Sequence, residues 1–578
     1  MHRFAPTLIL VFVSAGLAAA AEPGAGRNAA GENKEPNQVS ADARAFLNDY
    51  QKQYAKLELA TNLAFWQASN SGREEDFAAA AAAELALRKF HSDREAYRRL
   101  RGLIEARPEL SPAETRALVV AELAYRANQL PEDLLKRMVD LSTEIDRTFK
   151  TFRAEMGGKR FSNNDLLEML QDEKQTPRRQ AIWEALKQVG APVGPKLVEL
   201  AKIRNEAARR LGFDNYWQMQ IRLQEHDPEQ LLALFEELDR LTRQPFAEAK
   251  QAIDREVGER LGEKAEDLMP WHYDNPFFQA APPSAQVDLN EFYEDKSRED
   301  IVELSRTFYA GIGLPVDDIL KRSDLYEREG KDQHAFSISI DRSGDVRILC
   351  NVKPTAEWMD TQLHELGHAV YEIDIDPELP YNLRQPAHAF TTEGVAMLFG
   401  ALGKNPAWMV NVAGADRQRV RQVSAAILEQ RRREQLIFAR WTLVMLNFEK
   451  TLYENPEQDL NARWWEIVGR FQQLKQPAGR AGAPDWAAKP HFTIAPVYYH
   501  NYMLGELFAA QLRHVLAREA GHEGPASELR FEGRREVGDY LKQKVFRPGA
   551  LMAWPQFVAS ATGEPLTARY FAAEVGAK

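Results

Sequence analysis

The sequence predicts a mainly α-helical protein with a small antiparallel β-sheet. Amphipathic stretches such as residues 76–103 and 131–156 repeat apolar residues every three or four positions, which is the period of a helix that buries one face. Residues 334–352 instead form two apolar runs around the polar turn 342–345, which is typical of a hairpin. The helical pattern returns at Glu357 and continues toward the end of the chain, so the sheet is expected to be small.

The composition is that of a folded, acidic protein of 578 residues, with 44% apolar residues and a formal net charge of −11. No stripe of Lys and Arg appears in the sequence, which argues against nucleic acid and anionic membrane surfaces as partners. Cys350 is the single cysteine, so no intramolecular disulfide can form.

Residues 1–21 have the pattern of a secretory signal: a basic start, an apolar stretch from Leu8 to Leu17 and a run of small residues before the expected cleavage. The alternative is a membrane anchor, but the apolar stretch is shorter than the roughly 20 residues that a spanning helix needs. Residues 22–38 are rich in Gly, Ala and polar residues and are expected to form a disordered lead-in. We therefore expect export to a bacterial periplasm or secretion, with no membrane anchor, and a single domain over residues 39–578.

Proline and glycine divide the expected helices. Between residues 41 and 254 breaks are expected at Pro108, Pro131, Gly157-Gly158 and Pro192/Pro195, and new helices are expected to start at Ser111-Pro112 and Thr176-Pro177. A loop rich in Pro and aromatic residues follows at 271–283, and a Gly/Pro-rich segment at 477–490 interrupts the C-terminal helices.

Residues 364–368 are His-Glu-Leu-Gly-His, the spacing of a zinc-binding helix. On a helix, the imidazoles of His364 and His368 lie one turn apart on one face and can bind one metal ion, while Glu365 can reach a water bound to it. The alternative is a pair of unpaired histidines on a solvated helix face.

A catalytic zinc needs a third protein ligand, and Glu393 is the best candidate. Residues 390–399 form a strongly apolar helix, where an unpaired carboxylate is costly and a metal ion removes that cost. Glu372 shares the face of the two histidines but lies about 12 Å along the helix from His364, too far to complete the site. The alternative for Glu393 is an ion pair with an Arg such as Arg384.

Three segments outside the zinc motif carry a family resemblance. They are His334-Ala335-Phe336-Ser337, Lys489-Pro490-His491 and Tyr499-His500-Asn501-Tyr502. Together with the zinc motif, they resemble the angiotensin-converting-enzyme (peptidyl-dipeptidase A) family of gluzincin zinc metallopeptidases, over residues 195–571, and indicate a divergent bacterial member. The segment 204–216 also resembles a stretch of the related thimet-type oligopeptidases.

The resemblance implies a large helical peptidase with two lobes around a deep central cleft and a small antiparallel sheet next to the zinc helix. The long helices before residue 160 are expected to form a lid over the cleft, which would exclude folded proteins and admit short peptides. The resemblance also implies one Zn²⁺ per chain. Glu365 is expected to act as general base, and His491 and Tyr502 to stabilise the oxyanion of the substrate carbonyl.

The same resemblance implies four substrate-binding residues. His334 and Ala335 are expected to hold the substrate backbone. Lys489 and Tyr499 are expected to bind its free C-terminal carboxylate. We expect Lys489 and His491 on one extended segment, two residues apart and therefore on one face.

The sequence departs from the family pattern at several positions. The interval between the zinc motif and Glu393 is one residue longer and matches the oligopeptidases, and the interval from His491 to Tyr499 is also one residue longer. Asn501 occupies the position of the chloride-binding Arg, which argues against chloride activation. The Gln that helps to bind the substrate carboxylate has no clear counterpart in residues 269–274.

These features predict a zinc metallopeptidase that releases dipeptides from the C-terminus of short peptides. A thimet-type oligopeptidase that cleaves short peptides internally is the first alternative, favoured by the longer spacing before Glu393. A helical binding protein stabilised by zinc, without turnover, is a remote alternative. Glu365 argues against it, because a structural zinc takes a fourth protein ligand in place of water.

Overall fold

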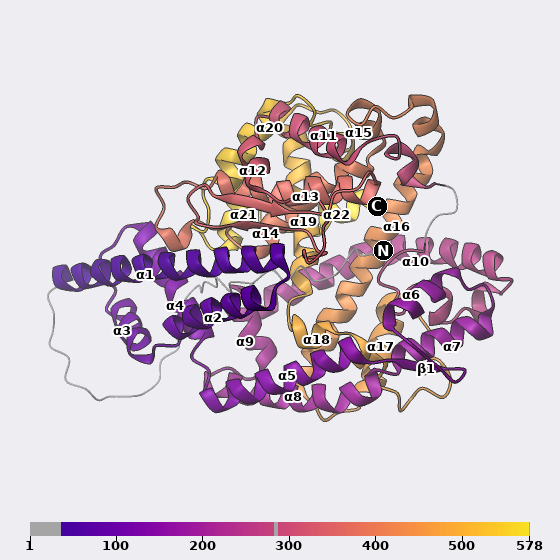
Figure 1. The fold of residues 1–578 in the computed structure, drawn as a ribbon, viewed down its shortest axis with the longest axis horizontal. Helices are drawn as coiled ribbons and strands as arrows, with labels where there is room; N and C mark the ends of the chain where they lie inside the picture. Colours follow the sequence, from indigo (N-terminus) through magenta and orange to yellow (C-terminus); the bar gives the residue numbers. More distant parts are fainter. Residues whose placement is uncertain (1–35, 283–286, 577–578) are drawn as a thin grey trace.

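The computed structural model describes residues 36–282 and 287–576, and this part of the chain is built mostly of helices (Figure 1). The predicted export signal, residues 1–21, lies outside the described residues, as does the lead-in up to residue 35. Helix α1 begins at Pro36, so residues 36–38 of the predicted lead-in are helical. None of the described helices is long and apolar enough to cross a membrane.

The first four helices form a bundle at one side of the molecule, drawn in indigo and purple in Figure 1. They bury an apolar cluster of their own, which Leu383 and Ala550 join from much later in the chain. The stretch predicted as helical over 76–103 is two helices, because Asp93 starts a new one by accepting the backbone N–H groups of Glu95 and Ala96. The bundle comprises α1 (Pro36–Ser71), α2 (Glu74–His91), α3 (Arg94–Glu105) and α4 (Pro112–Ala127).

The lower lobe in Figure 1 follows, and its longest helix, α10, runs along the boundary with the upper lobe. Helices α4 and α7 begin at the predicted Ser111-Pro112 and Thr176-Pro177 steps, with Pro in the first turn. The break predicted at Pro192 and Pro195 is wrong, because both prolines lie within the helix that spans Gly190–Arg210. The helices of this part are α5 (Glu132–Thr151), α6 (Asn163–Asp172), α7 (Thr176–Lys187), α8 (Gly190–Arg210), α9 (Tyr216–Leu223) and α10 (Pro228–Leu261).

A hairpin that the sequence analysis missed follows α5. Strands β1 (Ala154–Met156) and β2 (Lys159–Phe161) pair antiparallel, and the prediction of a helix through residue 156 is wrong at its end. The turn is Gly157-Gly158, with φ of 58° and 71°. Both turn residues therefore have the positive φ that a tight two-residue hairpin needs and that glycine adopts without strain.

The predicted β3–β4 hairpin is confirmed in the upper lobe. β3 (Phe336–Ser339) and β4 (Val346–Leu349) pair antiparallel and pack on α13 (Ala356–Ile373), the helix of the zinc motif. Other helices of this lobe are α11 (Arg298–Gly311), α12 (Asp317–Arg322), α14 (Ala389–Gly400), α15 (Pro406–Asn411), α19 (His500–Glu519), α20 (Arg535–Tyr540), α21 (Trp554–Thr562) and α22 (Arg569–Glu574).

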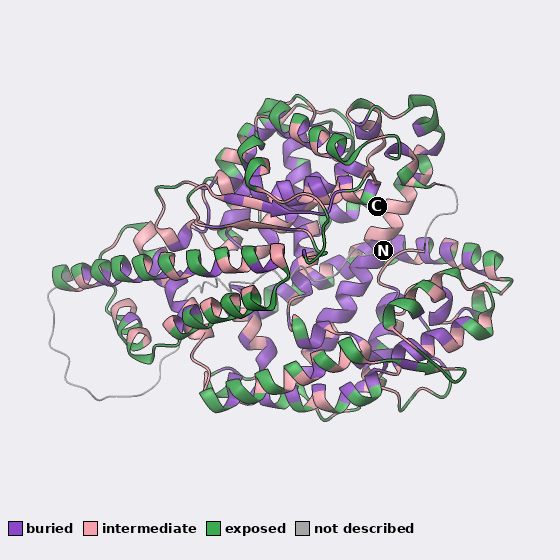
Figure 2. Ribbon diagram, in the orientation of Figure 1, coloured by how far each residue is buried: buried purple, intermediate pink, exposed green. Residues whose placement is uncertain are grey.

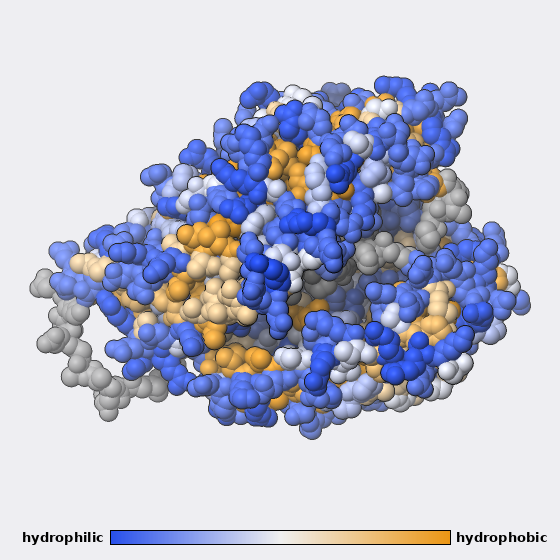
Figure 3. Space-filling view, in the orientation of Figure 1, coloured by the Kyte–Doolittle hydropathy of each residue, from blue (hydrophilic) through white to orange (hydrophobic). Residues whose placement is uncertain are grey.

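The main core extends through both lobes. The long helix α16 (Arg417–Glu454) passes from the upper lobe into the lower one, where α17 (Leu460–Gln472) packs against it. Helices α13, α14 and α19 are buried along most of their length (Figure 2). Figure 3 shows a largely hydrophilic surface that is recessed between the lobes. The mainly α fold is confirmed. The buried helices α13 and α14 carry the predicted metal-binding residues, and α19 carries Tyr502.

Candidate functional site

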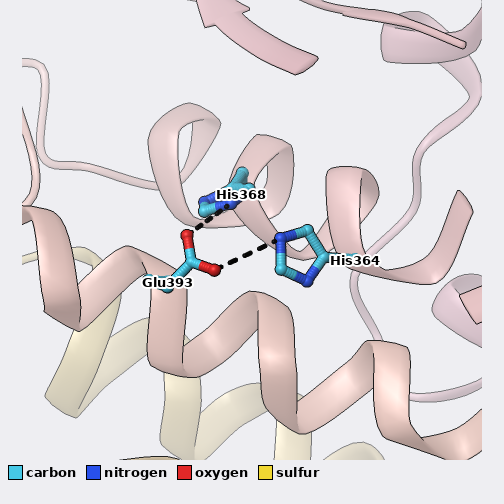
Figure 4. A group of neighbouring side chains, drawn as sticks. All are labelled: His364, His368 and Glu393. Atoms are coloured by element: carbon cyan, nitrogen blue, oxygen red, sulfur yellow. Dashed lines mark ion pairs between the residues drawn. The ribbon is translucent and has the colours of Figure 1, made fainter. Parts of the chain in front are cut away.

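Two neighbouring helices, α13 and α14, bring together the three residues predicted to bind a metal ion. His364 and His368 extend from α13, and Glu393 extends from α14, toward a common point (Figure 4). Nε2 of His364 lies 3.7 Å from Oε1 of Glu393, and Nε2 of His368 lies 3.6 Å from Oε2. One ligand atom from each residue lies within 4.8 Å of the other two.

Two glycines explain how α14 lies so close to α13 on one side and to α19 on the other. A Cβ atom on Gly367, inside the zinc motif, would lie 2.8 Å from Cα of Ala396 on α14. A Cβ atom on Gly394 would lie 2.9 Å from the carbonyl oxygen of Gly505 on α19. A larger residue at Gly367 would push α13 and α14 apart, so this glycine sets the distance between the imidazoles and the carboxylate. A larger residue at Gly394 would push α14 away from α19.

The donor set fits a zinc ion. Two imidazole nitrogens and one carboxylate are common ligands of catalytic zinc and leave a fourth position for water. At zinc–ligand distances of about 2.0–2.2 Å, tetrahedral ligands lie roughly 3.3–3.6 Å apart, close to the two distances from the imidazole nitrogens to the oxygens of Glu393. Nδ1 of His368 lies 2.8 Å from Oγ1 of Thr392. This contact orients the ring so that Nε2 points to Glu393.

The surroundings favour an ionised Glu393 and a more basic Glu365. Burial disfavours the charged form of Glu393, but the hydrogen bond from His368 and the positive field of both histidines outweigh burial and lower its pKa. Burial also raises the pKa of Glu365, and here the two histidines and hydrogen bonding from the backbone of Ser337 reverse only part of the rise. Glu365 therefore lies between the metal-binding residues and strand β3.

Arg384 does not pair with Glu393, so that alternative for the carboxylate is wrong. The guanidinium of Arg384 donates to the carbonyl oxygen of Leu379 at 2.8 Å and to Oγ of Ser343 at 3.2 Å. Glu372, one turn beyond the zinc motif, is partly exposed, but its Oε2 atom is buried and burial raises its pKa to about 7.

His491, Tyr499 and Tyr502 form one aromatic cluster at the start of α19. The ring centroid of Tyr499 lies 5.0 Å from that of His491 and 5.4 Å from that of Tyr502. Both ring nitrogens of His491 are buried and lack a hydrogen-bond partner among the described residues, and burial lowers its pKa to about 2. Burial, followed by the fields of Tyr498 and Glu393, raises the pKa of Tyr502. Both side chains can therefore act as neutral hydrogen-bond donors, and Tyr502 lies within the field of Glu393.

The ammonium group of Lys489 lies in a buried pocket of aromatic rings. It lies 5.1 Å from the ring centroid of Trp441 and 5.5 Å from that of Tyr499, and it donates a 2.6 Å hydrogen bond to Oε1 of Gln279. Burial lowers the pKa of Lys489 to about 7. The hydroxyl of Tyr499 is buried in the same pocket, next to Trp441. The side chains of Lys489 and Tyr499 therefore lie in one pocket, and Gln279 contacts Lys489 there.

Two details of this pocket differ from the sequence-based expectation. Gln279 lies five residues beyond the segment 269–274, and its place in the Pro- and aromatic-rich loop is the one signal that could have pointed to it. The segment from Lys489 to His491 is not extended, because it connects the short helices η6 (Asp485–Ala488) and α18 (His491–Ile494). Pro490 directly precedes α18, and its φ of −63° and ψ of −25° are already those of a helix.

His334 and Ala335 lie immediately before β3, beside the zinc helix. The side chain of His334 is about half exposed, and its Nδ1 lies 3.3 Å from Oδ1 of Asp332. That hydrogen bond raises the pKa of His334 against the opposing effect of burial. Ala335 packs against the main core. Ser337, further along β3, is the residue whose backbone contacts Glu365. The contacts of His334 and Ala335 are with Asp332 and with the main core, and not with the metal-binding residues.

Comparisons with known proteins agree with this arrangement. A family model described as angiotensin-converting enzyme matches residues 37–570. Angiotensin-converting enzyme of Mesocricetus auratus is 21% identical over 564 residues, which cover 92% of this chain and 42% of that protein. The rat enzyme, from Rattus norvegicus, is 21% identical over 401 residues, 65% of this chain and 30% of that protein. Carboxypeptidase 1 of Bacillus subtilis (strain 168) is 23% identical over 483 residues, 77% of this chain and 85% of that protein. The chain thus spans less than half the length of these two angiotensin-converting enzymes.

Proposed function

The chain belongs to the angiotensin-converting enzyme family, and from this premise we propose that it is a zinc peptidase that removes dipeptides from the free C-terminus of short peptides. The observation that carries the proposal is that one fold contains both a metal-binding donor set and a buried cation. His364, His368 and Glu393 supply a zinc donor set. Lys489 supplies a buried cation beside Tyr499, whose ring also packs against those of His491 and Tyr502.

Each residue of the site has a role in peptide hydrolysis. A zinc ion held by the three ligands would lower the pKa of a water molecule toward about 7 and polarise the scissile carbonyl. Glu365, whose pKa is raised by burial, accepts the proton of the attacking water and passes it to the leaving amine. His491 and Tyr502 donate hydrogen bonds to the carbonyl oxygen as negative charge develops on it.

The buried Lys489 supports C-terminal rather than internal cleavage. An ammonium group in an aromatic pocket is costly to bury, and a substrate carboxylate would supply the charged partner that Gln279 cannot. We expect His334 and Ala335, immediately before β3, to hydrogen-bond an extended peptide through the backbone.

Two other cleavage patterns remain candidates. Removal of single residues is favoured by the similarity to carboxypeptidase 1, which extends over 85% of that protein. Internal cleavage is favoured by the one-residue-longer interval before Glu393, as in the thimet-type oligopeptidases. A zinc-stabilised binding protein without turnover is disfavoured, because Glu365 occupies the position of a general base.

Mass spectrometry of the products from one peptide, as the free acid and as the C-terminal amide, separates these functions. We expect the zinc-loaded protein to release dipeptides from the free acid and nothing from the amide. Release of single residues would indicate a carboxypeptidase, and internal cuts in both peptides an oligopeptidase. Glu365→Gln is the matched control, expected to lose about 10²–10⁴ in turnover. Product formation at the wild-type rate by this variant would exclude Glu365 as the base.

A further inference from the structure

The connection between His491 and Tyr499 contains a strained residue. Val497 has φ of 54° and is fully buried. A β-branched residue rarely adopts this left-handed conformation, which glycine and asparagine populate more easily. The interval that contains Val497 is one of the two that are a residue longer than the family pattern. Such strain persists only when the surrounding structure holds the residue in place.

Two buried side chains hold Val497 from opposite sides of its backbone. Its N–H group donates a 2.8 Å hydrogen bond to Oε1 of Glu449 on α16. Its carbonyl oxygen accepts a 2.9 Å hydrogen bond from Nε2 of Gln224, at the C-terminal end of α9. Glu449 is 3% exposed and Gln224 is 7% exposed, so water does not compete with either bond. The conformation of the connection is therefore fixed from two other helices.

Gln224 makes two further hydrogen bonds, both to segments of the candidate site. Its Oε1 accepts a 2.7 Å bond from Nδ2 of Asn501, the residue before Tyr502. Its backbone carbonyl oxygen accepts a 2.9 Å bond from Nε2 of His388. The direction of that bond follows from the other ring nitrogen of His388, which accepts the backbone N–H of Phe390.

These contacts make Gln224 a junction of three segments. The connection at Val497 carries His491 and Tyr499, α19 carries Tyr502, and α14 begins at the His388 cap and carries Glu393. Helix α9 lies in the lower part of the molecule, whereas α14 and α19 lie in the upper part (Figure 1). One residue thus contacts all three segments: its side chain binds the two that carry the predicted oxyanion donors, and its backbone carbonyl binds the cap of the helix that carries the third metal ligand.

We propose that Gln224 is a positioning residue for the reaction, with Glu449 as its partner at Val497. This inference rests on the proposed function. Gln224 contacts neither the metal-binding atoms nor the aromatic rings of the site, and it acts by fixing the distance from His491 and Tyr502 to the point where charge develops. Donors aimed at an oxyanion must be placed closely, since a misplacement of about 1 Å can cost roughly 10²-fold in rate.

The test compares Gln224→Leu with Gln218→Leu, a matched change on the same helix. The readouts are kcat, KM, zinc content and affinity for a phosphinic peptide, which imitates the tetrahedral geometry of the reacting carbonyl. For Gln224→Leu we expect kcat to fall about 10–100-fold with KM changed less than about threefold. Affinity for the phosphinic peptide should fall by the same factor as kcat/KM, while zinc content and the affinity for a product dipeptide stay unchanged. Gln218→Leu should behave as wild type.

A second pair of variants keeps the test decisive if Gln224→Leu does not fold. Glu449→Gln retains an acceptor for the Val497 N–H and should keep most of kcat, whereas Glu449→Leu removes it and should lose kcat and phosphinic-peptide affinity together. The proposal is overturned if either Leu variant keeps kcat within about twofold, or loses kcat without losing phosphinic-peptide affinity. A wild-type protein that neither cleaves peptides nor binds the phosphinic peptide would instead overturn the proposed function, and the inference with it.

Discussion

Thr392 has a defined role beside the metal-binding residues. Its Oγ1 lies 2.8 Å from Nδ1 of His368. Thr392→Val keeps the shape of the side chain but removes this contact, so the imidazole loses the partner that fixes its ring. We expect zinc affinity to fall about 10–100-fold, whereas Thr392→Ser should retain most of it. Competition with a chromophoric chelator measures both affinities, and equal values for the two variants would show that the hydroxyl does not orient His368.

Lys489 gives the predicted carboxylate pocket a pH dependence. Burial lowers its pKa to about 7, so the ammonium group is lost as pH rises through that value. Because a carboxylate binds to the charged form, KM for free-acid peptides should rise by up to about tenfold per pH unit above pH 7. The inhibition constant of an amidated peptide should not show this rise.

The variant Lys489→Ala tests the same residue without changing pH. Loss of a charge-assisted hydrogen bond worth about 1.5–3 kcal/mol should raise KM for free-acid peptides roughly 10–150-fold at pH 6 and remove the dependence above pH 7. The inhibition constant of the amide serves as the control. Equal losses for the acid and the amide would mean that Lys489 supports the fold instead of binding the C-terminus.

Residues with a local pattern can be found from the sequence, and residues with distant partners cannot. His364 and His368 share one helix face by spacing alone, and Glu393 is conspicuous as a carboxylate in an apolar helix. Gln279 and Gln224 bind partners that are 210 and 273 residues further along the chain. Neither contact leaves a periodic or compositional signal, so both required the folded structure.

At the scale of elements, helix α1 is tied to the β3–β4 hairpin that packs on the zinc helix. Nη2 of Arg342 lies 2.6 Å from Oε1 of Glu58, and both side chains are almost fully buried. Nδ2 of Asn62 donates to the carbonyl oxygens of Ser339 and Ile340. The predicted lid is therefore connected through the hairpin to the helix that carries the metal-binding residues.

Glu58→Leu should loosen this connection. It leaves the guanidinium of Arg342 buried without its carboxylate, a change that costs about 3–5 kcal/mol. Hydrogen exchange of the amides in α1 to α4 should accelerate strongly. Glu84→Leu, at the exposed Arg88–Glu84 pair on α2, should cost no more than about 1 kcal/mol. Similar exchange in the two variants would show that the ion pair does not hold α1 in place.

Helix starts follow from the sequence more readily than short strands. α4 and α7 begin where Pro occupies the first turn, because its fixed φ suits that position and its missing N–H costs nothing there. β1 and β2 have three residues each, too few to show an alternation against the strong helical period of α5. The four-residue strands β3 and β4 were predictable because apolar runs flank a clear polar turn.

Buried, uncharged histidines occur both in the N-terminal bundle of α1 to α4 and at the helices α14 and α19. Burial lowers the pKa of His91, in the N-terminal bundle, and of His388, before α14, to about 4. Burial, with a smaller effect of His388, lowers the pKa of His500 to about 3. In an unfolded chain these residues bind protons near pH 6.5. Between pH 6.5 and about 4 the unfolded chain therefore binds more protons than the folded protein, and stability falls as pH falls.

The whole molecule should consequently lose stability in mild acid. Each of these histidines should lower the free energy of unfolding by up to about 1.4 kcal/mol per pH unit between pH 6.5 and 4.5. Denaturant unfolding at several pH values measures the slope. His500→Phe keeps a ring, removes one titrating group and should make the slope shallower, whereas His514→Phe, at an exposed position of the same helix, should leave it unchanged. Equal slopes in the two variants, or a constant free energy from pH 6.5 to 5, would mean that His500 takes up a proton without unfolding. Because His91 lies in the separate apolar cluster of α1 to α4, exchange in that bundle should increase over the same pH range as exchange in the main core.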